Sequence, residues 1–556
     1  MPDAIVLVGL SGSGKSTVGR LVAQRLGQPL LDLDADIASR EGAHPADLIR
    51  DRGEASFREI ESGVLARACG VPGAVIATGG GAVIDPLNRW RLWEAGTVAW
   101  LDAPDEVLLA RLAEDEEARP MLDGDAAGRL ASLRAERTPF YRAADLRVDA
   151  SGPLEQVAGA VAAAIDRRHS PSPRSASRRL FDAEVRRDHP MGPRTARVVL
   201  GRDLDGAVLG DLLATVSTGA PVIVADRRPA GLLPELMAAL PAERRLAMSA
   251  GERSKRLRAV ERLLEAASAM GAERGDAWVG VGGGTTTDVV GAAAALYLRG
   301  VPFVALPTTW LGMTDAAIGG KVGVDLSAAK NAAGAFWPPV AIVGDVAALR
   351  TLPRARRLDG MGESLKAGLI GDPGLWRLVE TRGRAALRDD EAARFAIIDR
   401  SVRLKLGVVD RDPFESGERR TLNLGHTLGH ALEVESGYRL PHGHAVVLGL
   451  RAVAAIAAGR GAEPGLAERI DDVVASLGYR LRRAFDPAVV AHALGSDKKR
   501  HQGRQRWILP MAVGRVEEAD DVTDAELEAA LRVIRADEPS PGAAKRSVRP
   551  PGAPRT

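Results

Sequence analysis

The sequence predicts an α/β protein made of two bodies that follow one another along the chain. Apolar strands alternate with helical patterns over roughly the first 168 residues, and the same alternation restarts at Arg197. Between them, the segment from Asp166 to Asp182 is rich in Ser, Pro and Arg and has almost no apolar residues. Such a segment cannot bury enough surface to offset its ordering entropy, so we expect a spacer there.

Composition narrows the class of protein. The 556 residues exceed one compact core, and a net charge of +2 does not favour a nucleic-acid partner or a membrane surface. No apolar run approaches the roughly 18 residues needed to span a bilayer, and the first residues do not form a signal peptide. The single cysteine, Cys69, excludes thiolate-rich zinc sites. We therefore expect a soluble, cytoplasmic enzyme that acts on small molecules.

The same patterns predict the domain bounds. We expect a first domain over 1–168, a disordered spacer over 169–180 and an α/β half over 181–353. From about Arg354 an Ala/Leu/Arg-rich pattern predicts a helical half over 354–536, and residues 537–556 have the composition of a disordered tail.

The first body opens with a phosphate-binding loop. An apolar strand is followed by Gly-x-x-x-x-Gly-Lys-Ser from Gly9 to Ser16, and then by a helical pattern. In this context glycines let backbone N–H groups converge on phosphate oxygens, Lys15 adds a mobile cation, and the Ser16 hydroxyl can ligate Mg²⁺. The residues expected to bind ATP are Gly12, Ser13, Gly14, Lys15, Ser16 and Thr17.

Polar residues at the ends of later strands predict the acceptor of the phosphoryl group. Asp32 and Asp34 end a second apolar strand, and the triplet Gly79–Gly81 follows a third. Carboxylates suit the hydroxyls of a polyol, whereas the arginines Arg58, Arg119 and Arg137 suit an anion. Each of these charges alone is equally typical of a solvated surface, but their positions at strand ends favour a site.

These motifs resemble the shikimate kinase family over essentially the whole first body, which implies a nucleoside-monophosphate-kinase-like fold and shikimate as acceptor. The resemblance implies that Asp34 binds the ring hydroxyls and helps to deprotonate one of them. It implies that Arg119 lies on a lid over ATP and that Asp32 lies near Mg²⁺. The residues implied to hold shikimate are Asp34, Arg58, Gly80, Gly81 and Arg137. Another small-molecule kinase, such as a gluconate kinase, shares the phosphate loop and is the alternative.

The second body carries a glycine loop, "GGGTTTDVVG", at the end of an apolar strand. Such a loop suits close approach by a pyrophosphate, and Asp226, at the end of "VIVAD", suits a ribose hydroxyl. The loop is not in the usual first-turn position of a dinucleotide fold, so alone it is a weak signal. Together the two features predict a dinucleotide such as NAD⁺.

The histidines of this chain are unevenly placed. Four of the nine lie between His426 and His444. His426 and His430 share a helix face, His442 follows a short loop later, and Glu363 is the best candidate for an added carboxylate. Nitrogen and oxygen ligands without cysteine suit a catalytic zinc with an open position, although a histidine pair on an amphipathic helix is often structural. Lysines among small apolar residues nearby favour an anionic, phosphorylated substrate.

The second body resembles the 3-dehydroquinate synthase family from about Val198 to Ile534. The motifs "GERSK", "GGGTTTDVVG", "DAAIGGK", "KNAAGAF", "GESLKAG" and "LNLGHTLGHALE" occur in the family's order. This resemblance implies NAD⁺ as cofactor and Zn²⁺ (or Co²⁺) held by Glu363, His426 and His442, with His430 handling a proton or orienting the substrate. It also implies a homodimer, in which Arg299 reaches the phosphate pocket of the neighbouring subunit.

The resemblance further implies two sets of binding residues. The set for 3-deoxy-D-arabino-heptulosonate 7-phosphate, several members of which are implied to be catalytic, is Arg299, Asp315, Lys321, Asn331, Lys366, Lys405, Arg419, Asn423, His430, and one of Lys498 and Lys499. The set for NAD⁺ is Asp226, Glu252, Lys255, Gly283, Gly284, Asp288, Thr308, Thr309, Lys330 and Thr351.

Some positions depart from the family pattern. His444 stands where a Glu is usual and is a second, weaker candidate ligand, and Trp310 and Arg228 replace residues beside the cofactor. If the affinity for the cofactor differs from that of the family, we expect Trp310 and Arg228 to be the cause. Together the resemblances imply a bifunctional enzyme of the shikimate pathway, in which each half works alone because the spacer is disordered. The alternatives for the second body are a zinc- and NAD-dependent polyol dehydrogenase, a related sugar-phosphate cyclase, or an inactive regulatory module.

Overall fold

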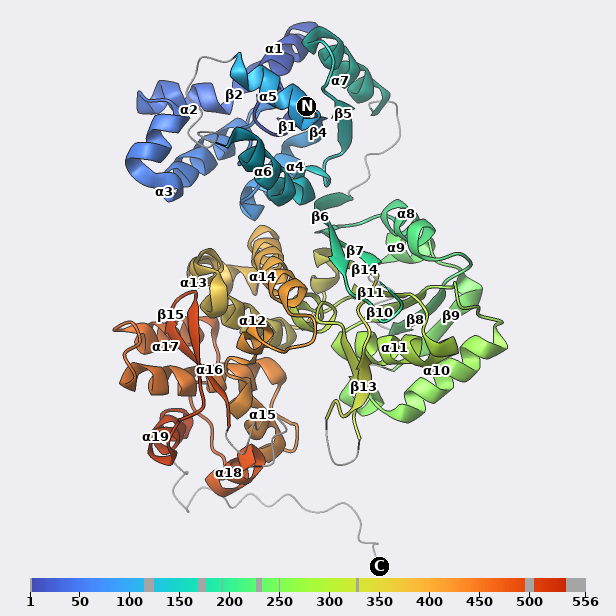
Figure 1. The fold of residues 1–556 in the computed structure, drawn as a ribbon, viewed down its shortest axis with the longest axis vertical. Helices are drawn as coiled ribbons and strands as arrows, with labels where there is room; N and C mark the ends of the chain where they lie inside the picture. The colour runs from blue at the N-terminus through green and yellow to red at the C-terminus, as the bar shows by residue number, and fades with distance from the viewer. Residues whose placement is uncertain are drawn as a thin grey trace, which may run out of the picture. The chain divides into compact units, whose positions relative to one another are not determined.

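The computed structural model describes residues 3–114, 125–168, 177–192, 194–226, 233–249, 251–326, 330–495 and 505–536 (Figure 1). The predicted sites at Arg119, Arg228, Lys498 and Lys499 lie outside these residues, as do most of the spacer and the tail. The chain forms two compact units. The first contains residues 1–360 and 385–414, and the second contains residues 361–384 and 415–556.

The first unit begins with a parallel five-stranded sheet in the order β2-β3-β1-β4-β5. Its central strand β1 is buried along its whole length, as expected of an apolar run covered by helices on both faces. The strands are β1 (Ala4–Val8), β2 (Leu30–Asp32), β3 (Val75–Ala77), β4 (Gly96–Asp102) and β5 (Leu146–Asp149). The helices are α1 (Lys15–Leu26), α2 (Leu33–Glu41), α3 (Pro45–Ala68), α4 (Pro86–Ala95), α5 (Asp105–Ala113), α6 (Ala126–Tyr141) and α7 (Leu154–Arg168).

The strand order brings two loops together at one edge of this sheet. The connection through α1 runs from β1 to β2, whereas the connection through α4 runs from β3 to β4 in the opposite direction. Because such crossovers are right-handed, α1 and α4 cover opposite faces of the sheet. The loops after β1 and β3 therefore lead away toward opposite faces. The phosphate loop follows β1, and the Gly79–Gly81 triplet follows the neighbouring strand β3. The two loops therefore begin side by side, at the edge where α/β sheets bind ligands.

A second sheet of seven strands completes the first unit, in the order β6-β7-β14-β11-β10-β8-β9. All neighbours are parallel except β6, which runs antiparallel to β7. The strands are β6 (Arg178–Arg187), β7 (Arg194–Arg202), β8 (Val222–Asp226), β9 (Arg245–Met248), β10 (Trp278–Gly282), β11 (Phe303–Pro307) and β14 (Ala341–Asp345). The remaining elements are helices α8 (Gly206–Val216), α9 (Pro234–Ala238), α10 (Leu257–Ala269), α11 (Gly284–Leu296) and α14 (Glu391–Arg411), the π-helix η6 (Gly312–Ala316), and the hairpin β12 (Lys321–Val324) with β13 (Ala333–Phe336).

The α/β class predicted for both bodies is confirmed. The apolar runs of the second body form β7, β8, β10, β11 and β14, as the alternating pattern predicted, whereas the edge strands β6 and β9 were not predicted. Residues 178–180, which the sequence analysis assigned to the spacer, begin β6. The domain bounds otherwise stay a prediction.

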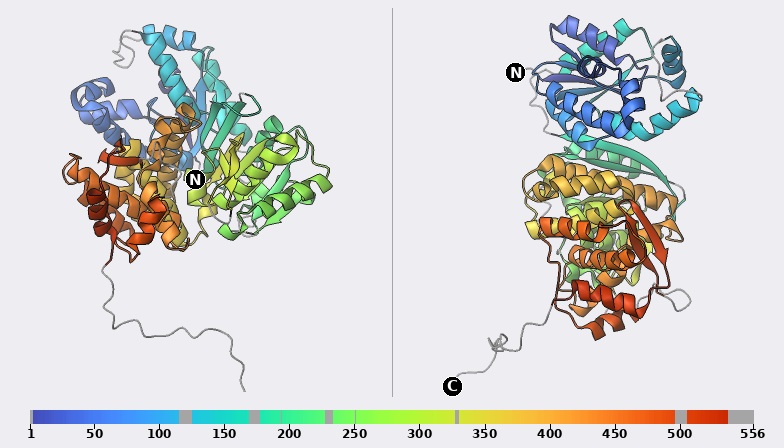
Figure 2. Two further views of the ribbon diagram at one scale, coloured as in Figure 1. Left: turned by 60° about the horizontal axis from the view of Figure 1, so that its bottom comes forward. Right: turned by 90° about the vertical axis from the view of Figure 1, so that its left-hand side faces the viewer.

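The second unit is mainly helical (Figures 1 and 2). Helix α12 (Arg354–Gly371) enters it at Met361, and the other helices are α13 (Pro373–Ala386), α15 (His426–Glu435), α16 (His442–Gly459), α17 (Leu466–Leu477), α18 (Pro487–Gly495) and α19 (Asp524–Ile534). The region predicted as wholly helical also contains a hairpin of β15 (Trp507–Ala512) and β16 (Arg515–Ala519), which packs against α16. This short apolar run is a strand and not a helix segment, and its residues Trp507, Ile508 and Leu509 are all buried.

Helix α16 is the buried centre of this unit. It is long and apolar enough to cross a membrane by length and composition, which the sequence analysis did not expect of any segment, but 72% of it is buried within the protein. A mostly buried helix of this kind is typical of a protein core.

Glycines allow α15 and α16 to approach closely. A Cβ atom on Gly449 of α16 would lie 2.0 Å from the carbonyl oxygen of Gly425, and a Cβ atom on Gly429 of α15 would lie 3.1 Å from the carbonyl oxygen of Ala445. Gly425 also has a φ of 74°, a left-handed conformation that favours glycine. Close packing therefore holds the beginnings of the two helices, His426 and His442, in one place.

We expect Gly449→Ala to lower the free energy of unfolding by about 1–3 kcal/mol, because the added methyl group must push α16 away from the backbone at Gly425. Urea unfolding monitored by circular dichroism measures the change. Gly459→Ala, at the exposed end of the same helix with no atom within 4 Å of the new methyl group, is the control and should be neutral or stabilising. Equal stabilities of the two variants would contradict the role assigned to Gly449.

Candidate active sites

The phosphate loop has the backbone geometry that an anion site requires. Gly12 and Gly14 have φ angles of 81° and 84°, and α1 begins directly after Gly14, which offers no side chain to cap it. The first N–H groups of a helix point outward and attract anions. Lys15 is 9% exposed, and its Nζ donates a hydrogen bond to the carbonyl oxygen of Leu10 at 2.9 Å. The loop therefore holds the ammonium group of Lys15 beside the N-terminus of α1.

The neighbouring acceptor site forms around Gly79–Gly81. A Cβ atom on Gly81 would lie 2.4 Å from Nη2 of Arg58, and one on Gly80 would lie 3.2 Å from Nη1 of Arg137. Likewise, a Cβ atom on Gly79 would lie 3.2 Å from Oδ1 of Asp34. The structure thus brings together the two arginines, the carboxylate and the glycine triplet that the sequence predicted. Because glycine has no side chain, the triplet leaves the space that the side chains of Asp34, Arg58 and Arg137 occupy.

Two residues of this site were missed by the sequence analysis. Glu61 is 1% exposed and accepts a hydrogen bond from Nη1 of Arg58 at 2.8 Å, and burial raises the pKa of its carboxyl although Arg58 opposes the shift. The Tyr141 hydroxyl donates to the carbonyl oxygen of Gly80 at 2.6 Å, and burial raises its pKa to about 12. The i, i+3 spacing of Arg58 and Glu61 was a usable signal; nothing local indicates Tyr141.

Asp32, predicted near Mg²⁺, is the N-cap of α2. Its Oδ1 accepts hydrogen bonds from the backbone N–H groups of Asp34 at 3.2 Å and Ala35 at 3.3 Å. This capping orients the helix that carries Asp34. The magnesium role of Asp32 stays a prediction.

In the second sheet, the predicted cofactor residues gather at the carboxyl ends of three adjacent strands. Asp226 ends β8, Gly283 and Gly284 follow β10, and Thr308 and Thr309 follow β11. A Cβ atom on Gly284 would lie 2.9 Å from Cβ of Ala316, so the loop backbone packs tightly. The hydroxyl oxygen of Thr308 is buried without a hydrogen-bond partner among the described residues. A bare helix N-terminus and an unsatisfied hydroxyl at one edge fit a pyrophosphate-containing cofactor.

The charged residues of the predicted cofactor set pair with one another. Nζ of Lys255 lies 2.5 Å from Oδ2 of Asp288, and Nζ of Lys330 lies 3.1 Å from Oε1 of Glu252. Burial raises the pKa of Asp288 to about 6 although Lys255 opposes the shift. Thr351 is exposed in the loop that precedes α12. The structure therefore joins four residues of this set in two ion pairs and leaves Thr351 at the surface.

The predicted substrate residues of the first unit include one close pair. Nζ of Lys405 on α14 donates to the backbone oxygen of Asp315 at 2.7 Å and also contacts its carboxylate. Lys321 begins β12, with its Nζ 6.0 Å from the centre of the Phe336 ring. Asn331 has a φ of 50°, and its N–H donates to Asp325 at 2.8 Å. Arg299 is exposed at the end of η5 (Tyr297–Arg299).

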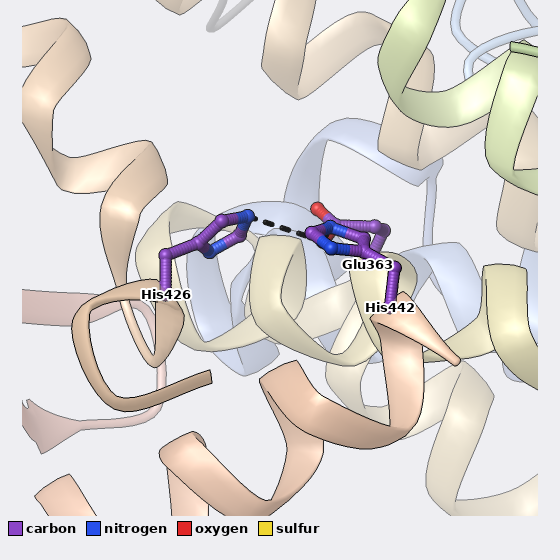
Figure 3. A group of neighbouring side chains, drawn as sticks. All are labelled: Glu363, His426 and His442. Atoms are coloured by element: carbon purple, nitrogen blue, oxygen red, sulfur yellow. Dashed lines mark ion pairs between the residues drawn. The ribbon is translucent and has the colours of Figure 1, made fainter. Parts of the chain in front are cut away.

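The second unit brings together the three predicted metal ligands. Oε1 of Glu363, from α12, lies 3.5 Å from Nε2 of His426 and 3.2 Å from Nε2 of His442. One ligand atom from each residue lies within 4.8 Å of the others, and the three side chains point toward one another (Figure 3). Glu363 is 3% exposed and His426 is 8% exposed. Residues separated by up to 79 positions thus form one buried cluster.

The chemistry of this cluster fits a divalent metal ion. Oε1 of Glu363 is buried without a hydrogen-bond partner among the described residues, although two imidazole nitrogens lie near it. Burial acts to lower the pKa of His442, but Glu363 and Glu433 outweigh it and raise this pKa to about 10. Two imidazoles and a carboxylate are ligands of catalytic zinc, and a cation between them would satisfy the unpaired oxygen.

Other residues surround the cluster. Oε1 of Glu433 lies 3.5 Å from Nδ1 of His442, on the opposite side of the ring from Glu363, and His430, Glu433 and His442 form a second group of metal-ligating type. A carboxylate on the far nitrogen orients a metal-ligating histidine. The sequence analysis missed Glu433, although its i, i+7 spacing from His426 places both residues on one helix face.

The remaining predicted residues of this unit take different positions. Lys366 forms an ion pair with Glu363 on the same helix, Arg419 is buried, and Nδ2 of Asn423 donates to Glu415 at 2.7 Å. The ring of His444 lies 5.0 Å from that of Tyr479, and His444 belongs to neither of the two groups of metal-ligating type found among the described residues.

Comparison with known proteins places these sites in a class. Three family models match the chain: shikimate kinase over residues 11–166, the N-terminal part of 3-dehydroquinate synthase over 245–358 and its C-terminal part over 360–500. A 3-dehydroquinate synthase of Koribacter versatilis is 40% identical over 52% of this chain and 80% of that protein. Another, of Xanthomonas campestris pv. campestris, is 37% identical over 60% of this chain and 90% of that protein.

Among solved structures, the 2-epi-5-epi-valiolone synthase of Streptomyces hygroscopicus subsp. jinggangensis, which has NAD⁺ and Zn²⁺ bound, is 30% identical, with a TM-score of 0.56. The match covers 61% of this chain and 96% of that one. The fold and the sites define a phosphate-loop kinase fused to a sugar-phosphate cyclase. The chain belongs to the 3-dehydroquinate synthase family, and its synthase body follows a shikimate kinase domain.

We expect Glu433→Gln to weaken the binding of Zn²⁺ by about 10- to 100-fold, because the neutral amide orients and polarises His442 less strongly than the carboxylate does. Competition with a chromophoric chelator measures the affinity. Glu435→Gln on the same helix is the control, because Glu435 pairs with Arg483 at 2.6 Å and not with a histidine. An unchanged affinity in the Glu433 variant would show that the second carboxylate does not support the site.

Proposed function

We propose that the first domain transfers the γ-phosphoryl group of ATP to shikimate, giving shikimate 3-phosphate. We propose that the synthase body converts 3-deoxy-D-arabino-heptulosonate 7-phosphate to 3-dehydroquinate and phosphate. The observation that carries the second assignment is the convergence of Glu363, His426 and His442 on one buried point. The relatives named above support a synthase over a polyol dehydrogenase.

In the kinase domain the residues mainly position and neutralise charge. Arg58 and Arg137 bind the carboxylate of shikimate, and Asp34 accepts the proton of the hydroxyl that attacks the γ-phosphorus. Lys15 leaves the carbonyl oxygen of Leu10 and balances the charge on the transferred group as the bond to ADP breaks. Mg²⁺, when bound at Ser16, screens the phosphates. The closeness of Arg58, Arg137 and Asp34 around Gly79–Gly81 supports these roles.

In the synthase body the residues bind an anionic sugar and two cofactors. A bound NAD⁺ would supply reversible hydride transfer, and a divalent ion, Zn²⁺ or Co²⁺, held by Glu363, His426 and His442 would supply polarisation of the substrate oxygen. Gly283, Gly284, Thr308 and Asp226 bind the dinucleotide. His430, whose ring centre lies 5.2 Å from that of His426, moves a proton beside the metal site. The remaining basic residues bind the phosphate and carboxylate groups of the substrate, namely Arg299, Lys321, Lys366, Lys405 and Arg419.

We expect the full-length protein to release phosphate from 3-deoxy-D-arabino-heptulosonate 7-phosphate without accumulating NADH, because the hydride returns to the substrate in each turnover. Removing the metal with a chelator should abolish this release, and Zn²⁺ or Co²⁺ should restore it. A coupled phosphate assay and the absorbance of NADH measure the two quantities. Steady accumulation of NADH would favour the dehydrogenase alternative.

Lys15→Ala provides an internal control for this experiment. It should lower phosphorylation of shikimate by at least about 100-fold while the synthase reaction stays at the wild-type rate. The chelator experiment and the substitution therefore separate the two activities in one chain.

We further propose a cytoplasmic homodimer that forms through the synthase body. Leu298 and Arg299 both have positive φ angles, of 46° and 66°, and the apolar side chains of Leu296 and Leu298 are exposed beside them. Strained residues persist where the surroundings or a function require them, and exposed leucines are typical of interfaces.

We expect light scattering at micromolar concentrations to give the mass of two chains. Leu298→Asp should shift the mass toward one chain, because a charge would be buried in the interface. Leu257→Asp, on the exposed surface of α10, is the control. A monomeric wild-type protein would contradict the proposal.

A further inference from the structure

An ion pair is completely buried inside the first unit. Nη2 of Arg89, on α4 of the kinase domain, lies 2.6 Å from Oδ1 of Asp399, on α14 of the synthase body. Both side chains have an exposed fraction of 0%. Asp399 also accepts from Nε of Arg403 at 2.9 Å. The two residues are 310 positions apart, and no predicted catalytic role uses either of them.

The same guanidinium group holds the acceptor loop of the kinase. Nη1 of Arg89 donates to the carbonyl oxygens of Val83 at 2.7 Å and Ile84 at 3.0 Å. Only Ala82 separates these residues from Gly79–Gly81, and the backbone N–H of Ile84 donates to the oxygen of Gly81 at 3.0 Å. Arg89 therefore connects the substrate-binding turn to a helix of the other enzyme.

Aromatic rings enclose this connection. The guanidinium carbon of Arg89 lies 4.3 Å from the centre of the Phe140 ring, and Phe140 lies 5.9 Å from Phe181 of β6. The next residue, Tyr141, binds the carbonyl oxygen of Gly80. The acceptor loop is thus supported by Arg89, which pairs with Asp399, and by Tyr141, whose neighbour Phe140 packs against Phe181.

The electrostatics make Asp399 essential to this arrangement. A charge buried without water is stable only beside a partner, and removing one partner leaves the other uncompensated. Burial lowers the pKa of Arg89 to about 10 although Asp399 opposes the shift. Without the carboxylate, Arg89 would turn toward water and release the carbonyl groups of Val83 and Ile84.

We propose that α14 of the synthase body positions the acceptor loop of the kinase through the Asp399–Arg89 ion pair, so that shikimate binding depends on the synthase body of the same chain. Arg89 and Asp399 are positioning residues, because neither contacts the substrate. The proposal rests on the proposed function of the first domain. It replaces the sequence-based expectation that each half works alone.

The test is Asp399→Asn in the full-length protein. We expect the KM for shikimate to rise at least tenfold, while the KM for ATP and the synthase rate stay within twofold of the wild type. Hydrogen exchange of the amides of residues 79–84 should become faster. Glu184→Gln is the matched control: Glu184 of β6 pairs with Arg142 of the kinase domain at 3.1 Å, but it is half exposed, so all these quantities should stay unchanged.

An unchanged KM for shikimate together with unchanged exchange would overturn the proposal. If Asp399→Asn impairs folding, the double variant Arg89→Met/Asp399→Leu removes both charges and should restore folding and the synthase rate. Its KM for shikimate should stay raised, because Val83 and Ile84 remain without their donor; a wild-type KM would overturn the proposal. A wild-type protein that does not phosphorylate shikimate would refute the proposed kinase function instead, and faster loop exchange in the variant would still report the positioning.

Discussion

The buried carboxylate of Glu363 is the constraint around which the second unit is built. A carboxylate at this depth needs compensating groups, and the protein supplies Lys366 on the same helix and two imidazoles from α15 and α16. Both imidazoles begin their helices, so their positions depend on how closely those helices pack. The glycines between α15 and α16 therefore belong to the site as much as the ligands do.

The two sheets of the first unit share one arrangement although their strand orders differ. Each places a glycine loop at the carboxyl end of a buried parallel strand, followed directly by a helix, at Gly12–Lys15 and at Gly283–Gly284. A fused chain can carry two nucleotide sites because each sheet has its own such edge, with its own partner residues.

Much of this was predictable from the sequence because it is local. The phosphate loop, the glycine triplet and the five strands of the second body have patterns that a single segment displays. Tyr141 and Glu433 were missed because their importance arises from contacts with residues on other segments. Glu61 was missed although its partner Arg58 lies three residues away on the same helix. Strand β6 was missed because its first residues, Arg178 and Arg179, read as part of the spacer, although Phe181 and Ala183 are buried. Nothing near Asp399 in the sequence indicates its partner at Arg89.

Strand β6 also determines where the two enzymes can be divided. It pairs along its length with β7 and is itself an outermost strand of the seven-stranded sheet. A truncated synthase that begins after Arg187 would present the bare hydrogen-bonding edge of β7, which is a template for aggregation. A soluble fragment must therefore start no later than Ser177, and a poorly behaved fragment that starts later would report a damaged sheet and not an intrinsically unstable enzyme.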